Sequence, residues 1–165
     1  MRGHVLFQRS VLSLGLLAGV AFPAAAAGTV EVAWVEPQRY LDAGRRPWER
    51  EDTLKSLGEI FKRLGSQLPD GQILKIEVLD VDLAGDLDPT TGRDVRILRG
   101  RADGPRITLR YTLQQGGQIL KAGEDQLTDV NYFQGTLRST VQSDGDLAYE
   151  KRMISKWFGE TFAAP

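Results

Sequence analysis

The chain has 165 residues, of which 41% are hydrophobic and 26% are charged, and these values are typical of one globular domain. Its 21 basic and 22 acidic residues give a formal net charge of -1, so nothing in the charge balance argues for nucleic acid or an anionic membrane as the main partner, and we expect neither. The sequence contains no cysteine, which excludes disulfides, thiolate nucleophiles and cysteine-ligated metal sites.

The first 27 residues have the pattern of a signal peptide. Arg2, His4 and Arg9 supply a cationic start, an uncharged apolar run covers residues 11–20, and alanines at 24–27 form an A-x-A cleavage pattern. A run of about ten residues is too short to span a bilayer. We therefore expect cleavage near Ala26 or Ala27 and a periplasmic or secreted protein without a transmembrane segment. An uncleaved N-terminal anchor is the alternative, whereas a lipoprotein would need a cysteine.

Cleavage would remove the only histidine and leave 138 residues with 19 basic and 22 acidic side chains. A chain without histidine and cysteine cannot use Ser-His-Asp or Cys-His catalysis, nor can it hold a metal through imidazole. We expect no cofactor. Any chemistry must come from carboxylates, hydroxyls, amides, lysine, arginine or tyrosine.

The first half of this mature chain predicts a strand, a loop and a helix. Residues 29–36 alternate, with Val30, Val32 and Trp34 on one side, and Pro37 ends the strand. Residues 37–48 read as a loop. Apolar residues then recur every three or four positions over residues 49–68, which predicts an amphipathic helix, and acidic residues at its start favour the helix dipole.

The second half predicts four strands and a helix. Both faces of the strand at 72–82 are largely apolar, which favours a central position. A strand at 93–98 follows, and the one at 106–113 alternates between Ile107, Leu109, Tyr111 and Leu113, facing inward, and Arg106, Thr108, Arg110 and Thr112, facing outward. The sequence Gln115-Gly-Gly117 predicts a hairpin turn into a strand at 118–127.

Residues 131–145 read as a long loop or ragged edge strand, and residues 146–158 as a second helix buried through Leu147, Ile154, Trp157 and Phe158. This order of elements predicts one α+β domain over residues 28–165. We expect an antiparallel-rich mixed sheet of about five strands, with the two main helices packed on one face.

Four carboxylates, Asp80, Asp82, Asp86 and Asp88, lie where a strand enters a glycine-containing loop. Oxygen ligands of this kind suit calcium, but their spacing does not match an EF-hand. The simpler interpretation is that they end a strand, pair with arginines or cap loop amides. A third interpretation makes two of these carboxylates, or Glu77 with Asp80, the acid and base of a glycosidase.

Six arginines between residues 93 and 110 are the main basic concentration, and Arg106 and Arg110 should share the outer face of one strand. They could hold a phosphate or carboxylate ligand, or they could simply balance the nearby aspartates. Among the three tryptophans we expect Trp48 to be the most exposed, because it lies in a proline-containing loop.

Three segments together resemble a known family. They are VAWVEP at residues 32–37, LDVDLAG at 79–85 with PRITLRY at 105–111, and YEKRMISKWF at 149–158. The likeness is to domain-of-unknown-function family 3016, exported proteobacterial proteins without an established activity. It implies a single exported domain and no catalytic residue. Positions that look typical of the family are Asp80, Asp82, Gly85, Arg106, Tyr111, Asp129, Tyr132, Tyr149 and Trp157.

Such residues suggest a polar network in which Asp80 or Asp82 pairs with Arg106, next to Arg110 and Tyr111. We expect a non-enzymatic envelope module that binds an envelope protein or an anionic small ligand through its sheet face or the Asp-rich loop. An assembly accessory, a carboxylate-based hydrolase of a cell-envelope glycan and a calcium-binding module are the alternatives. The sequence leaves the oligomeric state open.

Overall fold

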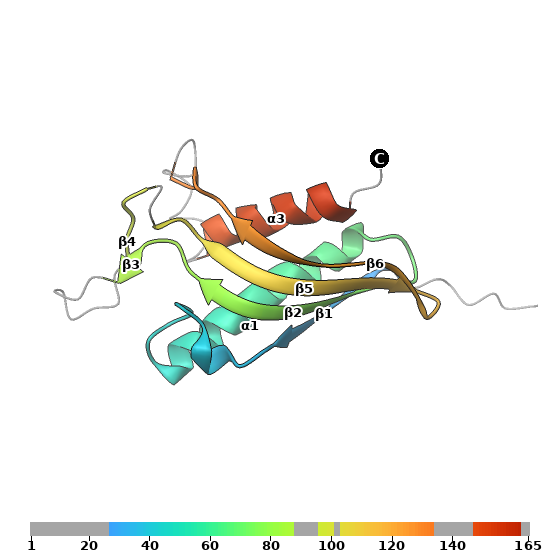
Figure 1. Ribbon diagram of the computed structural model, residues 1–165, viewed down its shortest axis with the longest axis horizontal. Coiled ribbons are helices and arrows are strands. Elements are labelled where there is room, and N and C mark those ends of the chain that lie inside the picture. Colours follow the sequence, from blue (N-terminus) through green and yellow to red (C-terminus); the bar gives the residue numbers. More distant parts are fainter. Residues whose placement is uncertain (1–26, 88–95, 101–102, 134–146, 163–165) are drawn as a thin grey trace, which may run out of the picture.

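A four-stranded sheet carries two helices on one face in the computed structural model, which describes residues 27–87, 96–100, 103–133 and 147–162 (Figure 1). The sheet has the strand order β1-β2-β5-β6. Its strands are β1 (Thr29–Trp34), β2 (Gln72–Asp82), β5 (Arg106–Gln115) and β6 (Gln118–Thr128), and its helices are α1 (Pro47–Arg63) and α3 (Ala148–Phe162). The predicted α+β class, mixed sheet and two main helices are confirmed.

The connections between the strands follow from their lengths. β1 and β2 are parallel, so the chain between them must return along the sheet, and α1 makes this crossover. β2 pairs antiparallel with β5, and β5 with β6. Gly116 and Gly117 both have positive φ, at 57° and 82°, which a two-residue type I′ turn requires and which only glycine adopts easily. The predicted hairpin is therefore confirmed.

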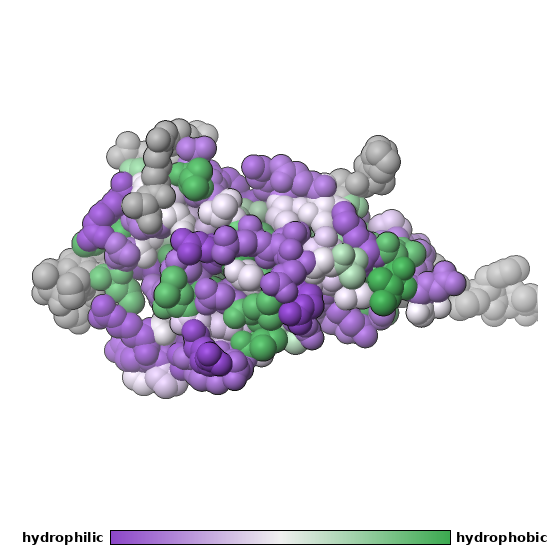
Figure 2. All heavy atoms as spheres, in the orientation of Figure 1, coloured by the Kyte–Doolittle hydropathy of each residue, from purple (hydrophilic) through white to green (hydrophobic). Residues whose placement is uncertain are grey.

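The core lies between the sheet and the two helices. The alternation predicted for β5 is confirmed, since Ile107, Leu109, Tyr111 and Leu113 are all buried against α1 and α3. On the opposite face, Lys75, Glu77 and Arg110 are exposed. Seen from the side of Figure 1, the described surface mixes hydrophilic and hydrophobic residues without one continuous apolar face (Figure 2).

A β-bulge in β2 explains why the sequence of this strand suggests two apolar faces. Val78 pairs with Leu109 and Asp80 pairs with Thr108, so Leu79 is an extra residue without a partner on β5. The extra residue reverses the alternation, and Val78 and Val81 both point into the core. The predicted central position holds, because β2 lies between β1 and β5. Its outer face, however, is open to solvent rather than buried.

The predicted strand at 93–98 is not part of the main sheet. Only Arg96–Ile97 form a strand, β4, which pairs with β3 (Asp86–Leu87) in a separate two-stranded sheet. Residues 93–95 lie outside the described residues. Gly85, with its positive φ, lies where the chain leaves β2, and the described residues form a main sheet of four strands with this pair beside it.

The helix boundaries differ from the prediction by a few residues. α1 begins at Pro47, a residue suited to the first helical position, and after Arg63 it tightens into a 3-10 turn at Leu64–Gln67. Residues 134–146 of the predicted loop and helix start lie outside the described residues. Trp48 is 58% exposed against 8% for Trp157, as predicted, but it lies in the first turn of α1 and not in the predicted loop. No helix in the described part of the chain is long and apolar enough to cross a membrane.

Candidate functional site

The segment after β2 is held from two sides by charged residues. The Arg96 guanidinium donates to the carbonyl oxygen of Gly85 at 2.8 Å, to that of Ala84 at 3.4 Å and to the Asp42 carboxylate at 2.9 Å. From the other side, the Ala84 N–H donates to Glu150 Oε1 at 2.8 Å. Side chains from β4 and α3 therefore fix the backbone between them.

Gly85 occupies a position that no other residue fits without strain. Its φ is +76°, and a Cβ atom there would lie 2.6 Å from Leu98 Cδ2 and 2.8 Å from the Ile97 carbonyl oxygen. Its N–H donates to the Asp103 carbonyl oxygen at 2.9 Å. The tight approach of β4 thus requires glycine here.

A second polar network joins the adjacent loops. The fully buried Tyr132 donates its hydroxyl to Asp103 Oδ1 at 2.7 Å and accepts the Gly100 N–H at 3.3 Å. Burial and the hydrogen bond to Asp103 raise the pKa of Tyr132, so its hydroxyl stays a donor. Arg152 of α3 donates to Asp129 Oδ2 at 3.1 Å through Nε and to the Tyr132 carbonyl oxygen at 3.0 Å.

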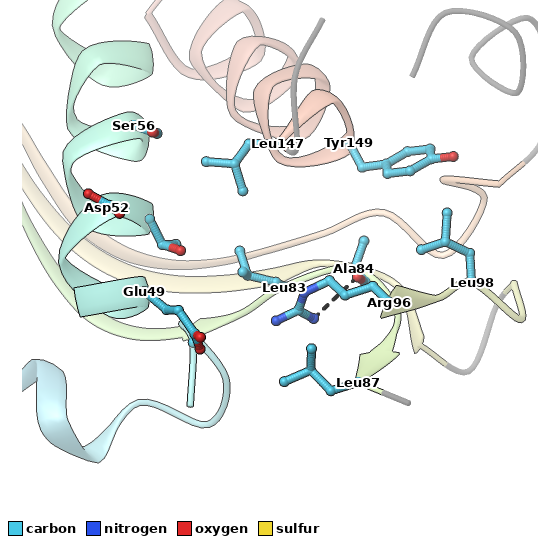
Figure 3. Close-up of a pocket in the computed structure, with 12 residues that line it drawn as sticks. Glu49, Asp52, Ser56, Leu83, Ala84, Leu87, Arg96, Leu98, Leu147 and Tyr149 are labelled. Atoms are coloured by element: carbon cyan, nitrogen blue, oxygen red, sulfur yellow. Dashed lines mark hydrogen bonds between the residues drawn. The ribbon is translucent and has the colours of Figure 1, made fainter. Parts of the chain in front are cut away.

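A pocket of about 520 Å³ opens beside these networks (Figure 3). It lies between the first half of α1, the end of β2, the β3–β4 pair and the start of α3. The residues that line it are Gly44, Glu49, Asp52, Thr53, Ser56, Leu83, Ala84, Leu87, Arg96, Leu98, Leu147 and Tyr149. A volume of this order is typical of small-molecule sites.

The two sides of the pocket differ chemically. Glu49, Asp52 and Ser56 lie on successive turns of α1, because positions three and four apart share a helix face. Leu83 and Leu147 lie across from them (Figure 3). The pocket thus has an acidic and hydroxylic side on α1 and, opposite it, leucine side chains together with the Arg96 guanidinium (Figure 3).

The Glu49 carboxylate already accepts hydrogen bonds at the start of α1. Its Oε2 accepts the N–H groups of Arg45 and Arg46 at 3.2 and 3.1 Å, and it pairs with the Arg46 side chain. Desolvation raises the pKa of Glu49, but the hydrogen bonds and the charge of Arg46 outweigh it, and the pKa lies below its ordinary value. Asp52 is exposed and makes no hydrogen bond or ion pair with the residues that the structure describes.

Glu150 is a buried carboxylate behind the pocket wall. The residue is 1% exposed, and its Oε2 has no hydrogen-bond partner among the described residues. Burial raises its pKa, while the Ala84 N–H and the Arg96 charge act in the opposite direction. Glu150 therefore supports the wall at Ala84 and does not line the pocket.

The aspartates predicted as a site have separate partners. Asp80 Oδ1 accepts the Leu41 N–H at 2.8 Å, and Asp82 lies 3.9 Å from Arg106. Burial raises the pKa of Asp82 despite the charge of Arg106. Asp86 pairs with Arg99. Asp88 lies outside the described residues, and the described His, Asp and Glu side chains form no group of three that could hold a metal ion.

Arg110 and Tyr111 point to opposite faces of the sheet. Arg110 lies on the outer face between Glu77 at 3.2 Å and Glu124 at 3.1 Å. Tyr111 is buried on the helix face, where its ring contacts Trp157 at 5.8 Å between centroids. The structure therefore brings Asp82 and Arg106 together but separates Tyr111 from both.

Sequence reasoning missed the pocket and Glu150. Glu150 stands three and four positions before Met153 and Ile154, both buried, so it falls on the apolar stripe of α3. A carboxylate in such a stripe is a signal that could have identified it. Arg96 carried no comparable signal, because its partners Asp42 and Gly85 are distant in sequence.

One family model matches almost the whole of the domain described above. The family model described as "Protein of unknown function (DUF3016)" matches residues 28–160, which cover the sheet and nearly all of α3. Neither the curated proteins nor the solved structures include a match to the chain. The resemblance seen in the three sequence segments is thus confirmed, and the chain belongs to the DUF3016 family of proteins of unknown function.

Proposed function

We propose that this protein is an exported, non-enzymatic binding module of the bacterial envelope and that the pocket beside Arg96 is its ligand site. The observation that supports this is the support given to the pocket wall, where Arg96 and Glu150 hold Ala84 and Gly85 from opposite sides. A pre-organised wall lowers the entropic cost of binding. Polar groups placed in a mostly apolar concavity are typical of ligand sites.

Export is supported by the sequence of residues 1–27, with its cationic start, short apolar run and alanine-rich end. The expected outcome in a native host is a periplasmic or secreted protein whose N-terminus is residue 27 or 28. Cell fractionation and N-terminal sequencing check this. A protein retained at full length in the cytoplasm would contradict it.

Binding of an envelope protein or an anionic small ligand to the sheet face is the less favoured form of this proposal, because the arginines there already have carboxylate partners. Arg110 is shared by two glutamates and Arg106 is near Asp82, so an anion would have to compete with carboxylates for both. A ligand in the pocket displaces neither of these sheet-face ion pairs, which is why we place the ligand there.

Native mass spectrometry of the protein purified from its own host tests the pocket. Ser56 lines the pocket, so Ser56→Trp should fill it and remove a bound ligand seen with the unchanged protein. Lys55→Trp is the matched control, because Lys55 is exposed on α1 and outside the pocket lining. A ligand retained equally by both variants would place binding elsewhere.

A carboxylate-based glycan hydrolase is the second candidate, favoured by the presence of Glu49 and Asp52 in the pocket lining. Such an enzyme needs a general acid with a raised pKa. The pKa of Glu49 is lowered instead, and Glu150, whose pKa is raised, does not line the pocket. Release of reducing ends from an envelope glycan, lost in Glu49→Gln and in Asp52→Asn, would favour the hydrolase over the binding module.

A further inference from the structure

We infer that the pocket binds an alkylammonium group, that is, a primary ammonium ion on an aliphatic stem, from either a free alkylamine or a lysine side chain. This inference rests on the proposal that the pocket is a ligand site. It concerns the chemistry of the ligand, which neither the family nor the sequence assigns.

The charge of the lining favours a cation. Among the residues that the structure describes, three charged side chains line the pocket: Glu49, Asp52 and Arg96. Arg96 is balanced by Asp42 at 2.9 Å, and both terminal nitrogens of its guanidinium already donate to protein oxygens. Asp52 has no such balance among the described residues. The described part of the lining therefore presents one carboxylate without a balancing charge and no cation without a partner.

The helix dipole at the start of α1 does not change the preference of the pocket for a cation. A helix N-terminus carries partial positive charge and favours anions. Here the Glu49 carboxylate already accepts the N–H groups of Arg45 and Arg46 next to the first turn. An incoming anion would meet that carboxylate and Asp52, and an incoming cation would be attracted to both. The Arg96 charge acts in the opposite direction, but it is balanced by Asp42 at 2.9 Å.

The side opposite α1 suits an aliphatic stem. Leu83, Leu87, Leu98 and Leu147 line it, and Leu83 and Leu147 lie across the pocket from Glu49 and Asp52 (Figure 3). An ammonium group near Asp52 would place the methylene groups attached to it against these leucines. Ser56 and Thr53 add hydroxyl oxygens that can accept its remaining protons.

A matched series of probes tests the inference. Hexylamine, hexanoate and hexanol have the same stem with positive, negative and neutral ends at pH 7. Two blocked tripeptides, Leu-Lys-Leu and Leu-Gln-Leu, test the lysine source. Binding is followed by the chemical shifts of the backbone amides of Thr53, Leu83 and Leu147 in the mature protein, at low and high salt.

The expected result is that hexylamine, the lysine peptide or both bind at these amides, and that hexanoate and hexanol bind at least tenfold more weakly. Asp52→Asn should weaken amine binding about tenfold, since it removes a charged hydrogen-bond acceptor. Glu59→Gln, on the same helix but outside the lining, should leave it unchanged. Higher salt should weaken binding because the Asp52 carboxylate is exposed.

Other outcomes separate the two proposals. Binding of hexanoate or hexanol as tightly as the amine, abolished by Ser56→Trp, would overturn the inference and keep the pocket as a ligand site. Amine binding unaffected by Asp52→Asn would also overturn it. Binding of the lysine peptide without free amine would identify a protein partner, and the reverse a small amine. If no probe binds, the inference is wrong. The proposed function is then tested separately, by whether Ser56→Trp loses the ligand that co-purifies with the unchanged protein.

Discussion

The buried side chain of Glu150 contributes to the pH dependence of stability. Burial raises the pKa of its carboxyl above the ordinary value of 4.5, so the folded protein holds a proton that the unfolded chain releases. Stability contributed by this group is complete below the unfolded pKa and is lost as pH rises through the folded pKa. Ala84 and Arg96 limit the effect but do not reverse its direction.

Glu150→Gln should therefore remove a pH-dependent cost. The amide keeps an oxygen for the Ala84 N–H and carries no charge at any pH. We expect the difference in melting temperature between Glu150→Gln and the unchanged protein to grow as pH rises above about 4.5, in favour of the variant. Thermal unfolding from pH 4 to 8 measures this, with Glu59→Gln as the exposed control. A difference independent of pH would contradict the prediction.

At the scale of elements, the turn at Gly85 determines where the β3–β4 pair lies. Gly85→Ala adds a Cβ at φ +76° against the Ile97 backbone and Leu98, so strain and overpacking act together. We expect a loss of about 3 kcal/mol in the free energy of unfolding, measured by urea denaturation. Gly116→Ala is the matched control, since its φ is +57° and nothing lies within 4 Å, and should cost about 1 kcal/mol. Equal losses would mean that contact with β4 contributes nothing.

The bulge at Leu79 is the second feature of this scale. Deleting Leu79 would make the ladder regular, because Val78, Asp80 and Val81 would keep their partners on β5 and therefore their faces of the sheet. We expect the deletion to cost about 1 kcal/mol in the free energy of unfolding. Leu79→Val keeps the extra residue and should cost less than about 1 kcal/mol. Urea denaturation of both variants checks the pair, and a deletion that costs several kcal/mol more than the substitution would show that the bulge itself stabilises the sheet.

At the scale of the whole molecule, two groups of polar contacts can be compared. We expect the contacts of Arg152 with Asp129 and Tyr132 to stabilise the fold more than the ion pairs of Arg110 on the outer face of the sheet. Arg110, Glu77 and Glu124 are each half-exposed, and exposed ion pairs contribute about 0 to 1 kcal/mol. Arg110→Gln should therefore lower the free energy of unfolding by less than about 1 kcal/mol. Arg152→Gln, which removes the arginine donor from Asp129 Oδ2 and from the Tyr132 carbonyl oxygen, should lower it by about 2 kcal/mol. The reverse order in thermal or urea unfolding would contradict this assignment.

The sequence by itself determined the α+β class, the hairpin at Gly116–Gly117, the buried side of β5 and of α3, and the family. These features depend on contacts close in sequence, namely alternation, helical periodicity and turn chemistry, and they can be read along the chain. The bulge in β2 reversed one such pattern, because a single extra residue changes the face of every position after it.

Only the tertiary structure decided the candidate site. Arg96 pairs with Asp42, which is 54 positions away in the sequence, and Glu150 accepts the N–H of Ala84, which is 66 positions away. The pocket itself needs α1, the end of β2, β4 and α3 at once. No local pattern encodes which distant acceptor a charged side chain reaches, because that choice follows from the packing of whole elements around the common core. Sequence reasoning therefore named the aspartates near the site, whereas the fold selected Glu49, Asp52 and Arg96 to line it.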